Sequence, residues 1–426
     1  MNYRWRWPRL GLLCAVLTGA PAGMASAQQA DSAAKARADS AAADSLALVR
    51  ELERLSSPGA TSTPRGQVQG AGPTNPRLLP DLSAVGDLIF DLSRKSSTQE
   101  DGSRFGVREV EVAIQAAVDP YFRGDFFFGF NDAEGVSIEQ AFLTATALPW
   151  ALEARLGRFF VPFGKQTTTH RHDLHTIEYP YVIQRFLSPD GLKGTGLYAS
   201  KIFSPFGFYQ ELIVSTVDRL GEPTEGLTPN EPTNASVKGL GYTARFRNYW
   251  DLTPNTNIEL SVSGATGLVS QPIDGGTDFN AVNARQSLFG ADFTYRWRPL
   301  QQGLYRSFIL QAEYMRQFNE GDPSLPAGVV PGQYLGPRRA FDGAYLFARY
   351  QLARRGFLGA RGDLVEDPQA GGRSLYAASA YYEFFPSEFS KLVAGYEHRW
   401  PQGTASESRL ILQATFALGP HKPHPF

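Results

Sequence analysis

The stretch Leu288–Arg298, "LFGADFTYRWR", alternates apolar and polar side chains along most of its length. One parity carries Phe289, Ala291, Phe293, Tyr295 and Trp297, and the other carries Asp292, Thr294, Arg296 and Arg298. Successive side chains of a β-strand point to opposite faces of a sheet, so the pattern predicts a strand with one apolar and one charged face. Such a strand suits a boundary between hydrocarbon and water.

Similar alternation recurs from Asp81 to the end of the chain. Further examples are "EVEVAIQAAV" (109–118), "YFRGDFFFGF" (121–130), "WALEARLG" (150–157), "LGYTARFRNYW" (240–250) and "RLILQATFAL" (409–418). The apolar parity is rich in aromatic residues, as a lipid-facing surface requires, whereas the other parity carries charges of both signs, as a water-filled lumen allows. Only around 136–147 and 341–364 is the alternation weak.

The connections between candidate strands alternate in length, which a soluble sandwich would not require. Short connections are expected at 119–120, 148–149, 204–207, 251–257, 299–305, 353–355 and 386–389; long ones are expected at 93–104, 132–135, 161–193, 219–236, 270–286, 319–340, 365–373 and 401–406. An even strand number with the N-terminus at the short-turn end predicts an all-β transmembrane protein, an antiparallel outer-membrane β-barrel of about 16 strands. Closure leaves no strand edge exposed to lipid.

The tryptophans support this arrangement independently. Trp150, Trp250 and Trp297 fall at the short-turn end of the predicted strands, and Trp400 falls at the opposite end. Tryptophan is enriched where a membrane meets water, so the sequence predicts two aromatic girdles.

The segment before the barrel has a different composition. Residues 1–27 have the basic, apolar and Ala-x-Ala regions of a signal peptide, which would remove the single cysteine, Cys14. Residues 28–56 are Ala-rich and predict a short periplasmic helix, either a loosely ordered tether or a coiled coil between subunits. Residues 57–80 read as a Pro/Gly-rich linker, and residues 81–426 as the barrel. The net charge of −1 gives no reason to expect a nucleic-acid partner.

Several motifs resemble the phosphate-selective porin (porin O/P-like) superfamily, in particular an uncharacterised branch of Gram-negative outer-membrane channels. They are "VDPYFRGDFFFGF", "LEARLGRFFVPFGKQ", "HRHDLHTIEYPYVIQRFLSPDGLKGTG" and the ending "LGPHKPHPF". The resemblance covers roughly Pro80–Phe426 and implies a sixteen-stranded homotrimer whose third extracellular loop folds inward. It does not transfer phosphate selectivity, because the dense ladder of arginine and lysine found in those channels is missing here.

The third long connection, 161–193, holds three of the six histidines in "THRHDLHTIEYP" (169–180). Folded into the barrel, it would narrow the passage and form a pore constriction from Lys165, His170, Arg171, His172, Asp173, His175, Glu178, Arg185 and Lys193. The facing pore wall would present Arg123, Arg155, Arg245, Arg247, Arg296 and Arg298 against Glu111, Asp125, Glu153, Asp292 and Glu313, and opposed clusters filter solutes by charge.

The histidines have several interpretations. They either hold the loop together by hydrogen bonds, or titrate in the solute path, or bind a divalent metal through His170, His172 and Asp173. We find no Gly-x-Ser-x-Gly elbow or Gly-rich phosphate loop, so neither an enzyme nor a cofactor is expected. The sequence favours a passive porin in the outer membrane, in contact with its lipid, for small hydrophilic solutes with an anion or phosphate preference. The alternative is a metal-binding or receptor-type outer-membrane protein that uses the loop histidines.

Overall fold

The computed structural model describes residues 80–99, 102–131, 135–218, 220, 237–272, 281–319, 339–368 and 372–419. The expected signal peptide, periplasmic helix and linker lie outside the described residues. Among the described residues, no helix is both long and apolar enough to cross a membrane.

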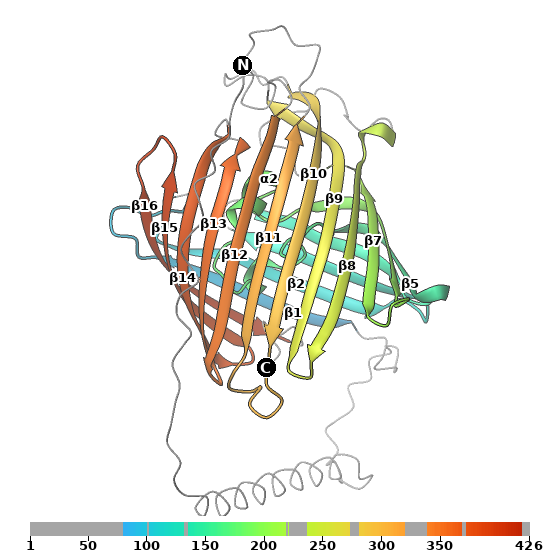
Figure 1. Ribbon diagram of the computed structural model, residues 1–426, viewed down its shortest axis with the longest axis horizontal. Helices are drawn as coiled ribbons and strands as arrows, with labels where there is room; N and C mark the ends of the chain where they lie inside the picture. The colour runs from blue at the N-terminus through green and yellow to red at the C-terminus, as the bar shows by residue number, and fades with distance from the viewer. Residues whose placement is uncertain are drawn as a thin grey trace, which may run out of the picture. The chain divides into compact units, whose positions relative to one another are not determined.

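The barrel region forms one closed antiparallel β-barrel of sixteen strands, each hydrogen-bonded to its sequence neighbours, with β1 closing against β16 (Figure 1). The strands are β1 (Asp81–Asp91), β2 (Phe105–Ala117), β3 (Phe122–Asn131), β4 (Gly135–Ala145), β5 (Leu152–Phe160), β6 (Lys193–Phe203), β7 (Tyr209–Val217), β8 (Gly241–Thr253), β9 (Thr256–Pro272), β10 (Ala281–Trp297), β11 (Phe308–Asn319), β12 (Arg339–Ala353), β13 (Gly356–Asp367), β14 (Arg373–Ser387), β15 (Ser390–Pro401) and β16 (Glu407–Leu418). The predicted fold class and strand number are confirmed.

Side-chain alternation follows the predicted parity. On β10 the side chains of Leu288, Asp292 and Thr294 are buried inside, whereas Phe289 is 47% exposed on the outer surface. The outer surface as a whole presents large apolar residues on nearly every strand. An uninterrupted apolar outer band is what a bilayer requires of a barrel.

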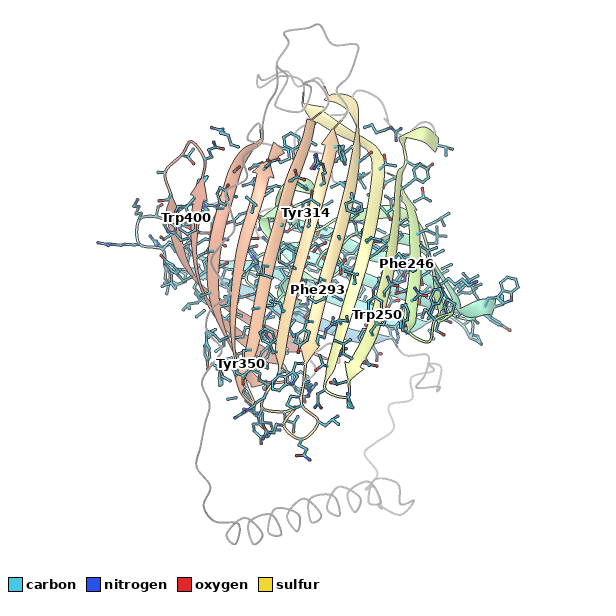
Figure 2. The ribbon with its side chains drawn as sticks, viewed as in Figure 1. Phe246, Trp250, Phe293, Tyr314, Tyr350 and Trp400 are labelled. Atoms are coloured by element: carbon cyan, nitrogen blue, oxygen red, sulfur yellow. The ribbon has the colours of Figure 1, made fainter. Side chains whose placement is uncertain are left out.

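Aromatic residues mark both ends of this band. Figure 2 shows Trp250 and Tyr350 toward the short-turn end and Trp400 nearer the opposite end, with Phe293 between them and Tyr314 at about the height of Trp400. The predicted positions of the tryptophans along the strands are confirmed.

The shorter elements lie in the connections. They are η2 (Pro149–Ala151) in a short turn, η3 (Arg171–Asp173) and α2 (Tyr181–Phe186) between β5 and β6, and η4 (Val237–Gly239) before β8. Among the described connections, 161–192, called L3 below, lies inside the barrel, and Figure 1 shows α2 within the ring of strands.

Candidate functional site

L3 crosses the interior and is bound by strands on several sides of the barrel. The amide of Gly164 donates to Ser263 Oγ of β9 (3.1 Å). Further along, the Tyr181 hydroxyl donates to Glu397 Oε1 of β15 (2.6 Å). These contacts join L3 to strands that lie far apart around the barrel.

The first attachment of L3 depends on a glycine. Gly164 has φ +67°, and a Cβ at this position would lie 1.7 Å from Glu313 Oε1, which accepts the amide of Lys165 (3.1 Å). Arg245 donates to the Gly164 carbonyl and lies 3.0 Å from Asp292 Oδ2. A residue without a Cβ allows both this conformation and this close approach to the wall.

The second attachment is apolar. The side chains of Val182, Ile183 and Phe186 in α2 are buried in one cluster with Phe341 and Phe347, which β12 contributes from its inner face. Other members of the cluster are Phe159, Val161, Phe163, Leu174, Tyr179, Tyr181, Leu192, Met315, Tyr345 and Val365. The expectation of a water-filled, charged lumen is wrong for the part of β12 from Phe341 to Phe347, because the inner face there receives a helix that excludes water. Nearer the short turn the same face carries Arg349 and Gln351, which line a cavity of 360 Å³.

The three loop histidines are held between L3 and the wall. His170 Nδ1 lies 2.6 Å from Glu111 Oε2, and His172 is only 1% exposed. His175 stacks on Phe347 with ring centroids 6.2 Å apart and lies 3.8 Å from Glu383 Oε2. These contacts fit a role in holding the loop in place.

Burial and nearby charges act differently on the three imidazoles. Burial alone would lower the pKa of His170, but the adjacent Glu111 carboxylate outweighs it and raises that pKa to about 9. Burial lowers the pKa of His172, and burial together with Arg349 lowers the pKa of His175. Neutral His172 therefore lies beside a His170 that favours its charged form, and neutral His175 lies apart from them against Phe347.

The remaining predicted constriction residues make ion pairs. Arg171 binds Glu178 (2.7 Å) and Asp190 (2.9 Å), and Lys165 binds Glu259 (2.6 Å). Lys193 binds Glu139, Arg185 lies 3.3 Å from Asp367, and Asp173 lies 3.7 Å from His172 Nε2. Four of the predicted constriction residues line cavities, and they line three different ones. Lys165 lines a cavity of about 610 Å³, and Arg171 and Lys193 line a separate cavity of 90 Å³. His175 lines a third cavity, of 360 Å³, together with Arg296 and Arg298.

The largest of these cavities lies between L3 and strands β4–β8. It has a volume of about 610 Å³ and is lined by the charged side chains of Glu153, Arg155, Lys165, Glu211, Arg245 and Arg247. Most of these residues lie near the strand ends that meet at the short turns, so the cavity occupies that half of the barrel. The 90 Å³ cavity contains Asn131, Ser137 and Lys193 from the long-loop half, and Phe160 lines both.

The wall charges are arranged differently from the prediction. Arginines and carboxylates pair on the same strand, on neighbouring strands or, for Arg245 and Asp292, across one intervening strand, instead of facing each other across the lumen. The pairs are Arg123–Asp125 (2.9 Å), Arg155–Glu153 (2.7 Å), Arg247–Glu211 (2.7 Å), Arg245–Asp292 (3.0 Å) and Arg296–Glu259 (3.3 Å), while Arg298 donates to the Gly303 carbonyl (2.9 Å). Alternating side chains of adjacent strands lie close enough to pair directly, which explains the difference.

Sequence reasoning missed the wall residues that bind L3 from the other side. Lys391 of β15 donates to the carbonyls of His172 and Leu174, and Arg108 of β2 donates to the carbonyl of Ile177. Glu139 of β4 was missed as well. The alternation shows the inward parity of Lys391 alone, because Arg108 and Glu139 lie at register shifts of β2 and β4. The partners of all three depend on the path of L3, which no local pattern gives.

The closed sixteen-stranded barrel with a loop packed inside defines the class: the chain has the fold of outer-membrane porins. Similar solved structures are a loop L8 deletion mutant of OmpT, an outer membrane protein of Vibrio cholerae (10% identity, TM-score 0.52, 80% of this chain and 99% of that chain), and an anion-selective porin from Comamonas acidovorans (12%, 0.50, 80% and 99%). OprB from Pseudomonas putida is similar too (9%, 0.50, 80% and 94%). At these identities the likeness concerns the fold alone.

One curated relative was found. It is an uncharacterized protein of Aquifex aeolicus, 26% identical over 345 residues that cover 76% of this chain and 70% of that protein. No family model matches the chain.

Proposed function

We propose that this protein is a passive channel of the bacterial outer membrane for small hydrophilic solutes. The observation that carries the proposal is the cavity of about 610 Å³ between L3 and the wall, which is lined by charged and hydroxyl side chains inside a barrel with an apolar outer surface. A charged cavity costs a membrane protein desolvation unless water and ions fill it. Solutes would pass between L3 and strands β4–β8, with Phe160 at the narrow region between the two cavities.

The charges around the cavity favour anions. Four basic side chains, Lys165, Arg155, Arg245 and Arg247, line it together with two acidic ones, Glu153 and Glu211. Fixed cationic groups in a pore attract anions and repel cations, so we propose a modest anion preference. Phosphate is one anion of this class, but the resemblance to phosphate-selective porins does not transfer that selectivity. The same resemblance supports a homotrimer, with the N-terminal segment in the periplasm.

Reversal-potential measurements test the proposal directly. Purified protein in planar bilayers should give ohmic conductance steps, and a KCl gradient should give a reversal potential of the sign for anion preference. Arg247→Gln should shift that potential toward cations, because the carboxylates of Glu211 and Glu259 lose a shared partner. Arg316→Gln is the matched control, since Arg316 pairs with Asp342 and is not among the residues that line this cavity. The absence of current would refute the channel.

A further inference from the structure

His170 and His172 of L3 meet a carboxylate of the wall. His170 Nδ1 lies 2.6 Å and His172 Nδ1 lies 3.9 Å from Glu111 Oε2 of β2. One donor atom from each of the three residues falls within 4.8 Å of the others. Two imidazoles and a carboxylate this close are a metal-ligating set, and all three side chains are largely buried.

A fourth donor comes from an irregularity in β4. In the pairing of β3 with β4, Phe127 faces Gln140 and Phe128 faces Ile138, so Glu139 is an extra residue at a register shift. A bulge of this kind re-aims the side chain it carries. Here Glu139 Oε2 lies 3.9 Å from His170 Nδ1.

The outer nitrogen of each imidazole is held by another side chain. Gln140 Nε2 lies 2.9 Å from His170 Nε2, and Asp173 Oδ2 lies 3.7 Å from His172 Nε2. These partners leave the Nδ1 atoms of both rings on the side of Glu111. A metal-binding histidine donates the N–H of its other ring nitrogen to an acceptor, as Asp173 offers to His172, so the side-chain oxygen of Gln140 has to turn toward His170 Nε2 when a cation occupies Nδ1. Asp173, expected from the sequence to be a ligand, is in this position an orienting residue, and Glu111 takes its place.

The surroundings add carboxylates to the cluster and give a cation a route. Glu109, Glu111 and Glu139 each have a carboxylate oxygen within 4.8 Å of the others, and Lys193 pairs with Glu139. Arg108, on the same strand as Glu109, forms its ion pairs with Asp87 and Glu178. The 90 Å³ cavity touches Glu109 and Glu139, so an ion reaching it from the long-loop half would meet these carboxylates.

We propose that His170, His172, Glu111 and Glu139 bind one divalent transition-metal cation of the zinc class. Imidazole with carboxylate donors suits this class, and donors about 2.0–2.2 Å from a tetrahedral zinc lie roughly 3.4 Å apart, between the shortest and longest separations seen here. Binding displaces the proton that joins His170 to Glu111. The cation then links L3 to β2 and β4, a role separate from solute passage.

Isothermal titration calorimetry with ZnCl₂ on the full chain in detergent tests the inference. All samples carry His421→Gln and His424→Gln, which remove the histidines of the C-terminal "HKPHPF". We expect one zinc per chain, and we expect Glu111→Gln and the pair His170→Gln with His172→Gln to weaken binding by more than about 100-fold. His175→Gln should bind as the parent does, because His175 is a loop histidine outside the cluster.

X-ray absorption at the zinc edge keeps the test valid if a variant fails to fold. The parent protein should show two imidazoles and oxygen donors around the bound zinc. Unchanged zinc binding in the double histidine variant, a coordination sphere without imidazole, or no binding by the parent at millimolar zinc would each overturn the inference.

Discussion

Glu178 connects L3 to itself and to the wall through a single carboxylate. Arg171 lies 2.7 Å away and Arg108 of β2 lies 3.4 Å away. Burial alone would raise the pKa of Glu178, but the guanidinium groups of Arg171, Arg108 and Arg409 lower it from 4.5 to about 2. Glu178 is therefore negatively charged in the folded loop, although it is buried.

The lowered pKa predicts how Glu178 contributes to stability at different pH values. A depressed folded-state pKa stabilises the fold above the unfolded value of 4.5, and the contribution disappears as the pH falls toward 2. Glu178→Gln should therefore lower the unfolding temperature in detergent at pH 7, and the difference from wild type should shrink between pH 4.5 and 2. Asp251→Asn, at an exposed strand end, is the control. A difference that is constant from pH 7 to 2 would contradict the assignment.

The two strands with weak alternation, β4 and β12, are both among those that L3 contacts. On β4 the register shift at Glu139 interrupts the period of two and places both Glu139 and Gln140 near His170. From Gly343 to Ala348 both faces of β12 are apolar, because the inner face packs against α2 while the outer face meets lipid. Irregular alternation was therefore a signal of the site, and only the loop's path reveals its meaning.

The contact between α2 and β12 predicts a way to release the loop. A Cβ on Gly343 would lie 2.5 Å from Val182 Cγ2 and 3.2 Å from Val365 Cγ2, so valine at 343 leaves no room for α2. Gly343→Val should keep the barrel folded but displace α2, and it should raise single-channel conductance. The matched control is Gly362→Val on the neighbouring strand, where a Cβ meets nothing within 4 Å. Equal conductance in the two variants would show that α2 does not restrict the passage.

At the scale of the whole molecule, the sequence predicted the number of strands and which side chains face lipid, because both patterns repeat along the chain. A period of two and an alternation of turn lengths depend on local sequence and on the contrast between lipid and interior. The sequence did not predict which wall residues bind L3 inside the barrel. Lys391 is 219 positions from His172, whose carbonyl it binds, and such a pair forms only after L3 has turned back across the lumen.

The lipid-facing surface predicts a cost that depends on depth in the bilayer. Val262 is 44% exposed on the outer face of β9 and pairs with Ala291 and Phe246 in the middle part of the neighbouring strands. Leu252 is 55% exposed on β8, near the short-turn end beside Trp250. Arginine at a bilayer midplane costs about 2–4 kcal/mol, falling to about 0–1 kcal/mol near the interface.

Val262→Arg should therefore lower the free energy of unfolding by about 2–4 kcal/mol in lipid vesicles, and Leu252→Arg by less than about 1 kcal/mol. Denaturant titration monitored by tryptophan fluorescence measures both. In detergent micelles the difference should shrink, because a micelle adapts its thickness around a charged side chain and lets water reach it. If the two variants lost equal stability in vesicles, the band between the aromatic girdles would not be the surface that faces hydrocarbon.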